Sequence, residues 1–268
     1  MRPGLFTRMA VTAVAVACLP LVGRGATVQV KVTITNLAPT NGVALSPFFL
    51  GAHDGSFNAF TPGAAAGLGI QNVAELADTT AITSEFGAAV PQGVSSTVVA
   101  TSGAFGPGIY LPGGSGSAIL TLDTVKNRYL SYAAMVVPSN DTFVGNASPT
   151  QVPLFDAGGN FVAQGFTVHG GDLWDSGTEV NQPFGAAFLA GSNITDHTAE
   201  NGLVTQINPA TQFTPYAGGL KADGYYFTGV PGASDGVVSF AFQVVPEPAT
   251  LGLLGWGALS LLARRRRA

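Results

Sequence analysis

Apolar and polar residues alternate strictly near both ends of the central part of the chain. In TVQVKVTITNL, residues 27–37, one face consists of Val28, Val30, Val32 and Ile34. In GVVSFAFQVV, residues 236–245, one face consists of Val238, Phe240, Phe242 and Val244. A period of two residues is the pattern of a β-strand with one buried face. The alternation therefore predicts a strand at each end of one folded unit, with both termini tied into sheets.

The sequence between these two segments also favours strands over helices, because Gly, Val, Thr and Phe are abundant and long helix-forming runs are few. Further strands are predicted over residues 95–101, 117–122, 129–137 and 225–229. The clusters LPGGSGS (111–117) and PGASDG (231–236) predict turns. One short helix is predicted within GIQNVAELADTTAIT, residues 69–83, with Asn72 as its candidate N-cap. We expect an all-β fold, either a sandwich or a barrel.

Residues 1–26 have the order of a secretory signal peptide. Basic residues come first, then the apolar run MAVTAVAVACLPLV, then small residues in GRGA. The run has about 14 residues, fewer than the roughly 20 that a membrane-spanning helix requires. Cys18, the single cysteine, lies in this run. Lipoprotein attachment there is disfavoured because Ala15 stands where an aliphatic residue is usual. The mature chain would then have neither disulfide nor thiol chemistry.

The last residues, 246–268, form a second targeting segment outside the folded unit. The triplet Pro246-Glu247-Pro248 precedes an apolar segment of about 14 residues, and four arginines follow it. Positive charge after a short hydrophobic segment keeps the tail on the cytoplasmic side. This arrangement closely resembles the PEP-CTERM sorting signal of exopolysaccharide-producing Gram-negative bacteria. The resemblance implies processing by an exosortase, transient anchoring in the inner membrane, and delivery to the cell surface; a plain C-terminal anchor is the alternative.

The charge of the unit between these segments, residues 27–245, is strongly negative. It contains four of the 11 Lys and Arg and 14 of the 15 Asp and Glu, so its formal charge is −10. Such a surface repels nucleic acid and anionic membranes and attracts cations. No fixed-period repeat or internal linker divides this unit. We therefore expect one domain with no nucleic-acid partner.

The stretch DLWDSGTE gathers three acids, Asp172, Asp175 and Glu179, with no Lys or Arg close in sequence. Gly177 allows a tight turn that points Asp175 and Glu179 the same way. Two carboxylates about 4 Å apart repel by roughly 4 kcal/mol at an effective dielectric constant near 20. A cation reverses that cost, and oxygen ligands of this kind suit Ca²⁺. From the loop alone, a solvated surface loop remains the alternative.

A second stretch, YAAMVVPSNDTFVGN, favours the cation. Met135–Asp141 and Trp174–Asn181 together resemble two motifs of the spondin N-terminal (F-spondin) domain, and the similarity extends over about residues 27–245. The resemblance implies a C2-like antiparallel β-sandwich and a calcium site with Asp141, Asp175 and Glu179 as metal ligands. Glu179 replaces an Asp of animal spondins and Thr142 replaces a Trp. Asp172 has no family role, which favours a solvent-facing position.

The histidines offer weaker chemistry. His53, beside Asp54 in a turn, is expected to make a structural hydrogen bond rather than to act as a ligand or base. His169 precedes two glycines, but no G-x-S-x-G motif accompanies it, so the sequence does not support an esterase. His197 lies among polar loop residues, which is typical of a surface position.

Three hypotheses follow for function. The first is a secreted, surface-sorted, non-catalytic β-sandwich that binds Ca²⁺ and contacts matrix polysaccharide or a surface protein. The second is an extracellular hydrolase that uses two of the clustered carboxylates on exopolysaccharide. Against it, Trp174 is the single Trp outside the tail, which is little for an aromatic-lined cleft. The third is a metal-free structural matrix protein. We expect the first.

Overall fold

The two alternating segments are neighbours in the structure, a computed structural model that describes residues 25–246. Thr27–Asn36 forms β1 and Gly236–Val245 forms β12, and the two pair antiparallel from Gln29–Val245 to Asn36–Val238. Val30, Val32 and Ile34 are buried as the alternation predicts. The predicted signal peptide, apart from its last two residues, and the tail after Pro246 lie outside the described residues.

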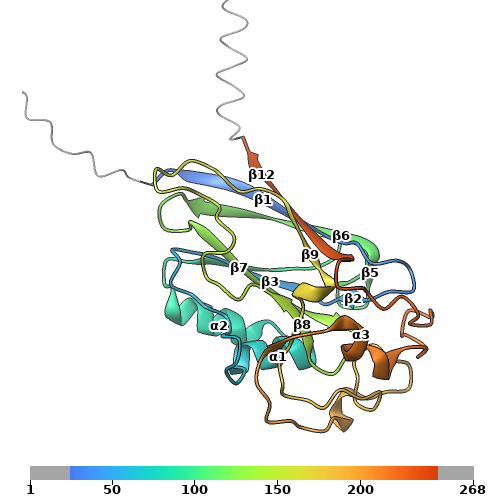
Figure 1. Cartoon of the computed structure of the whole chain (residues 1–268). Coiled ribbons are helices and arrows are strands. Elements are labelled where there is room, and N and C mark those ends of the chain that lie inside the picture. Colours follow the sequence, from blue (N-terminus) through green and yellow to red (C-terminus); the bar gives the residue numbers. More distant parts are fainter. Residues whose placement is uncertain (1–24, 247–268) are drawn as a thin grey trace, which may run out of the picture.

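The fold is mostly β, as predicted, and its strands are antiparallel. The sheet curls over into two layers linked by the short β2, Ala44–Leu45 (Figure 1). One layer contains β1, β12, β5 (Ser102–Phe105), β6 (Ile109–Asp123) and β9 (Phe166–His169). The other contains β3 (Phe48–His53), β4 (Val94–Val98), β7 (Tyr129–Val137), β8 (Thr142–Gly145), β10 (Trp174–Asp175) and β11 (Thr205–Gln206).

The main core lies between the two layers. Phe48 on β3 meets Phe240 on β12 edge-to-face at 5.6 Å between ring centroids. Tyr132 on β7 also packs on Phe240, at 4.6 Å. β3 and β7 belong to one layer and β12 to the other, and they do not hydrogen-bond to each other. These aromatic contacts therefore hold the two layers together.

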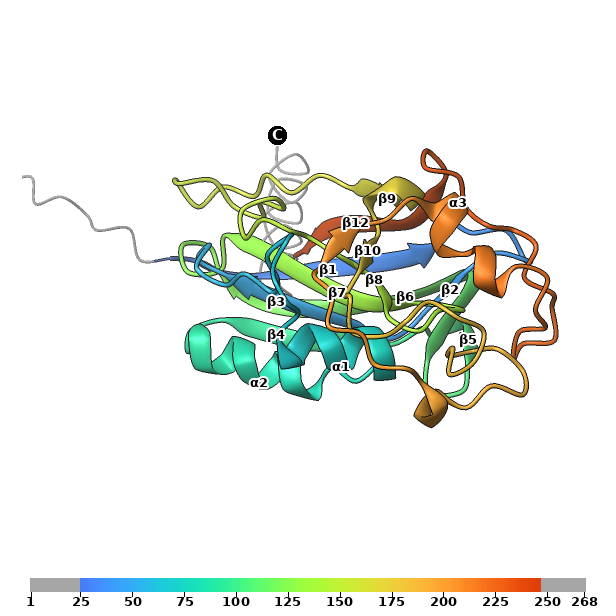
Figure 2. The same cartoon turned by 60° about the horizontal axis from the view of Figure 1, so that its bottom comes forward.

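A second core lies outside the sandwich, under helices α1 (Leu68–Leu76) and α2 (Thr80–Ala89), which cover the outer face of β3 and β7 (Figure 2). Phe86 of α2 packs edge-to-face on Phe49 of β3, with ring centroids 5.7 Å apart. The single predicted helix is therefore two helices, which separate at Ala77 in a left-handed conformation (φ 58°). Asn72 lies inside α1 and its N-cap is Gly67, so the predicted cap is wrong.

Two further predictions of local structure are wrong. The Gly-rich cluster 111–117 lies inside the long strand β6, where β5 and β1 pair with it. Gly113 (φ 77°) and its neighbours let that strand bend without ending. The segment 225–229 forms no strand. Its one β-type pairing is an isolated bridge between Leu220 and Tyr226. The remaining short helices are α3 (Pro209–Gln212) and 3₁₀ turns at 170–172, 194–196 and 214–216.

Candidate metal centre

Strand pairing brings the first two predicted ligands together. β7 ends at Val137, a turn follows, and Asp141 directly precedes β8. β10 pairs antiparallel with β8 so that Asp175 lies opposite Thr142. Two acids 34 residues apart in sequence therefore lie on adjacent strands.

Asp141 is fully buried, and its two carboxylate oxygens differ sharply. Oδ2 accepts hydrogen bonds from Ser176 Oγ (2.9 Å) and from the backbone amides of Thr178 (2.8 Å) and Glu179 (3.0 Å). Oδ1 is buried without any hydrogen-bond partner among residues 25–246. Buried oxygens of this kind are rare because each costs roughly 1–3 kcal/mol or more if it remains unpaired.

Asp175 is held in place by the loop that it begins. Its Oδ1 accepts from the backbone amide of Gly177 at 2.7 Å, and its Oδ2 accepts from Asn181 Nδ2 at 2.7 Å and Gln212 Nε2 at 2.6 Å. Gly177 has φ 68°, and a Cβ there would lie 2.7 Å from the backbone N and O of Leu203. Only glycine fits both the conformation and the space at this turn.

The backbone amide of Glu179 donates to Asp141, but the Glu179 carboxylate faces a histidine. Oε1 is 3.2 Å from Nδ1 of His197, a residue of the 196–200 segment that folds over the loop. Burial raises the pKa of Glu179 to about 7, and Glu75 adds to the rise while His197 opposes it. Burial also raises the pKa of Asp141 to about 6, with Asp175 as the charged neighbour. The site therefore carries more negative charge than its surroundings compensate.

The acid centre has features that fit a cation and one that does not. The unpaired Asp141 Oδ1 and the surplus negative charge fit a hard cation with oxygen ligands. Across residues 25–246, however, no group of three Asp, Glu, His or Cys side chains is arranged to hold a metal. Glu179 would have to exchange His197 for the ion, with backbone or amide oxygens completing the shell.

A polar network that the sequence motifs did not predict surrounds the acids. Gln212 Nε2 also donates to Asn181 Oδ1 (3.0 Å). The Tyr216 hydroxyl lies within hydrogen-bond distance of two acceptors, Asn140 Oδ1 (2.8 Å) and Asn181 Oδ1 (2.9 Å), between which its single proton is shared. Asn181 is the last residue of the second motif, so the sequence itself places it near Asp175 and Glu179. Nothing in the sequence predicts that Gln212 and Tyr216 lie at the site, because they come from a segment more than 30 residues further along the chain.

Asp172 and two of the histidines lie away from this centre. Asp172 Oδ2 accepts from the backbone amide of His169 at 2.9 Å, and both side chains are about half exposed. His53 is buried, accepts from the amide of Gly55 and contacts Ser131 Oγ at 2.9 Å, which is the structural hydrogen bonding expected of it.

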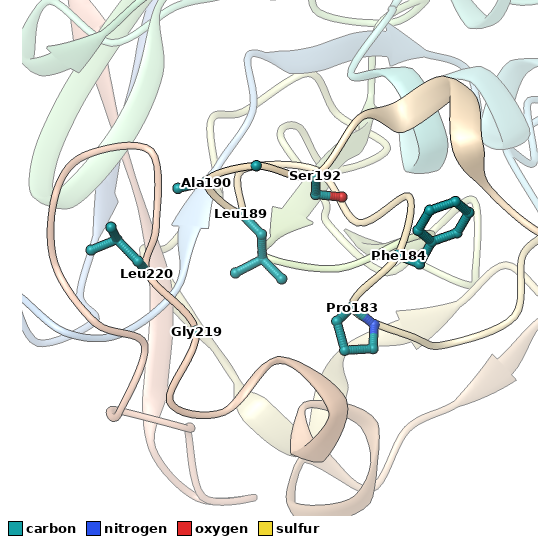
Figure 3. Close-up of a pocket in the computed structure, with 8 residues that line it drawn as sticks. Pro183, Phe184, Leu189, Ala190, Ser192, Gly219 and Leu220 are labelled. Atoms are coloured by element: carbon teal, nitrogen blue, oxygen red, sulfur yellow. The ribbon is translucent and has the colours of Figure 1, made fainter.

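A shallow apolar hollow of about 440 Å³ lies next to the acid loop. Pro183, Phe184 and Leu189 border it (Figure 3), with Leu220 and Ser192 nearby. Asn140 Nδ2 donates to the carbonyl of Phe184 at 3.2 Å, which connects the hollow to the turn before Asp141. Phe184 is 61% exposed, so an apolar contact surface adjoins the candidate centre.

Comparison with known proteins identifies the C-terminal segment. Residues 244–267 match the PEP-CTERM protein-sorting motif. The match confirms the predicted sorting tail and indicates an exported protein that an exosortase sorts to the cell surface. No matching family model supports the resemblance to the spondin domain, and no curated protein matches the chain. Within residues 25–246, no helix is long and apolar enough to span a bilayer.

Proposed function

We propose that this surface-sorted protein is a non-catalytic β-sandwich, residues 27–245, that binds Ca²⁺ and contacts extracellular matrix polysaccharide or a surface protein. The observation that carries the proposal is the buried, unpaired Oδ1 of Asp141 beside Asp175 and Glu179. Ca²⁺ at this oxygen would replace an unsatisfied buried charge with a compensated one.

The chemistry of the donors supports calcium over other metals. The three acids are hard oxygen donors, which Ca²⁺ prefers, whereas soft metals prefer thiolate, and residues 25–246 contain no cysteine. The negative charge of residues 27–245 would raise the local concentration of cations. Bound Ca²⁺ would join the turn before β8 to the loop after β10, two segments that otherwise meet through hydrogen bonds to Asp141.

Limited access to the acids supports a non-catalytic role over the hydrolase alternative. The exposed fractions are 0% for Asp141, 9% for Asp175 and 3% for Glu179. A glycosidase needs an acid and a second carboxylate facing a sugar and a water molecule. The oxygens of Asp175 accept from one backbone amide and two amide side chains, and Asp141 Oδ2 accepts from two backbone amides. Buried carboxylates held in this way are poorly placed for that chemistry.

Calorimetry of the purified protein, first in EDTA and then in Ca²⁺, tests the calcium proposal. A ligand at a hundred times its Kd stabilises the folded state by about 2.7 kcal/mol. For a domain of this size that is a rise in melting temperature of roughly 5–11 °C. An unchanged melting temperature in excess Ca²⁺, with no heat of binding, would favour the metal-free alternative.

A matched pair of variants locates the site. Asp141→Asn should abolish the response to Ca²⁺, whereas Asp156→Asn, on an exposed loop, should leave it intact. Turnover of exopolysaccharide that Glu179→Gln abolishes would instead support the hydrolase. Loss of the response in both variants would contradict this placement of the metal.

A further inference from the structure

A small polar hollow, separate from the acid centre, opens on the other side of β10. Its volume is about 210 Å³, and residues of β7, β8, β9, β10 and β11 line it. Its lining includes the side chains of Tyr132, Gln151, Thr167, Asp172, Trp174 and Gln206. Asp172 thus belongs to this hollow rather than to the candidate metal centre.

Several polar atoms around the hollow have unused hydrogen-bonding capacity. Asp172 Oδ2 accepts from His169, but Oδ1 has no partner within residues 25–246. Gln206 Nε2 donates to the carbonyl of Gly171 at 2.7 Å, which leaves its Oε1 available. In the same part of the chain, the side chain of Gln151 and the hydroxyl of Tyr132 make no hydrogen bond. Donors and acceptors therefore converge on one small space.

The Tyr132 hydroxyl is the most informative of these groups. The residue as a whole is only 2% exposed, but its hydroxyl oxygen is not among the fully buried polar atoms that lack a partner in residues 25–246, so the hydroxyl opens onto the hollow. Burial and the nearby Asp172 carboxylate raise the pKa of Tyr132 above its usual value, so the hydroxyl stays protonated and can donate. A ligand in the hollow would take the place of the water to which this hydroxyl otherwise donates.

The aromatic walls are fixed before any ligand arrives. Trp174 Nε1 donates to the carbonyl of Gly145 at 3.1 Å, and its ring packs edge-to-face on Phe60 at 5.1 Å. The ring of Tyr132 packs on Phe166 at 5.7 Å between centroids. Rigid aromatic side chains bind with little loss of conformational entropy.

Size and charge restrict the ligand. Pockets for drug-sized molecules have volumes of roughly 300–1,000 Å³, so this one accommodates a single small ring. The lining residues include one carboxylate and no Lys or Arg, which disfavours anions. A pyranose presents hydroxyl groups around its rim and C–H groups on its faces. It matches polar groups that converge beside aromatic surfaces.

We propose that this hollow binds one neutral pyranose unit of an extracellular polysaccharide. The inference rests on the proposed function for the nature of the partner, but binding here requires no metal. Asp172 Oδ1 and Gln206 Oε1 accept hydrogen bonds from sugar hydroxyls, and Tyr132 and Gln151 donate to sugar oxygens. Trp174 contacts the face of the ring.

Saturation-transfer NMR titrations of the purified protein test the proposal, with the methyl glycosides of glucose, galactose, mannose and glucuronic acid as probes. We expect saturable binding of at least one neutral glycoside in the millimolar range, equally in EDTA and in Ca²⁺. Glucuronide should bind more weakly than glucoside, because its carboxylate approaches Asp172.

Three variants locate the binding. Gln151→Leu should weaken binding about fivefold, as expected for one neutral hydrogen bond. Asp172→Asn should weaken it about tenfold or more, since the lost acceptor is charged, and should reduce the discrimination against glucuronide. Gln92→Leu removes another exposed glutamine outside the hollow, in the loop before β4, and should leave binding unchanged.

The possible outcomes separate this inference from the proposed function. No saturable binding of any probe, in a protein whose melting temperature still rises with Ca²⁺, overturns the sugar site and leaves the calcium proposal standing. Sugar binding without a calcium response supports the hollow and contradicts the metal. Equal weakening by Gln151→Leu and Gln92→Leu would also overturn the assignment.

Discussion

Replacing Asp141 by Asn should change stability in opposite directions with and without Ca²⁺. Burial and Asp175 raise the pKa of Asp141 to about 6, from the usual 3.8 of an aspartate. Above both values the carboxylate is ionised in the folded and the unfolded state. Its raised pKa then costs the folded protein about 3 kcal/mol, since one pKa unit corresponds to about 1.4 kcal/mol.

The asparagine variant removes that cost and keeps most of the contacts. Its side-chain oxygen can accept the bonds from Ser176, Thr178 and Glu179, while its amide occupies the position of the unpaired Oδ1. In EDTA at pH 7.5 we expect Asp141→Asn to be more stable than the wild type by up to about 3 kcal/mol, or roughly 6–12 °C in melting temperature. In excess Ca²⁺ the wild type should gain stability and the variant should not.

The pH dependence provides a second check on the same reasoning. A carboxyl whose folded pKa is raised destabilises the fold only above its unfolded pKa, so the cost disappears as the pH falls towards 4. The advantage of the variant in EDTA should therefore vanish near pH 4. Thermal unfolding followed by circular dichroism at pH 4 and 7.5 measures both effects, with Asp156→Asn as the exposed control. A variant that is less stable than the wild type in EDTA at pH 7.5, with an unchanged native spectrum, would refute the electrostatic argument.

Three further predictions concern the rest of the domain. Burial lowers the pKa of His53 to about 4, so stability should fall by up to about 3 kcal/mol as the pH drops from 6.5 to 4. His53→Gln should remove this component, as urea unfolding of the Ca²⁺-loaded protein at a series of pH values would measure. Lys221→Met should destabilise the domain by about 3–5 kcal/mol in urea, because Asp223 loses its buried partner at 3.1 Å; a neutral effect would contradict the importance of the pair. Gly177→Ala should lower the melting temperature in EDTA and Ca²⁺ alike, since a left-handed Ala costs roughly 1–2 kcal/mol before its contact with Leu203 is counted.

Strands with one buried face could be predicted from the sequence, because their signal is local. The alternation in 27–37 and 236–245 and the apolar run 129–137 correspond to β1, β12 and β7. The glycines of 111–117 predicted a turn, but pairing with the distant strands β1 and β5 keeps β6 extended there. The two helices were under-predicted since Ala77 interrupts one apparently continuous pattern.

The candidate site was only partly predictable for the same reason. The motifs place Asp141 and Asp175 at strand ends, and the pairing of β8 with β10 then brings them together. Gln212 donates to Asp175, 37 residues earlier in the chain, and no spacing in the sequence predicts that contact. The turn of Glu179 towards His197 depends on a loop that returns over the site, which local pattern does not specify.

The pairing of β12 with β1 also determines how the domain would respond to a pulling force. β12 runs directly into the sorting motif, because the strand ends at Val245 and the match begins at Val244. β9, which contributes to the polar hollow, pairs near the opposite end of β12, at Gly236–Phe240. If the hollow binds a polysaccharide as proposed and the chain is held at its C-terminal side, tension between the two would act along the axis of β12. The eight residue pairs that join β12 to β1 would then be loaded together in shear, rather than opened one after another as in a zipper.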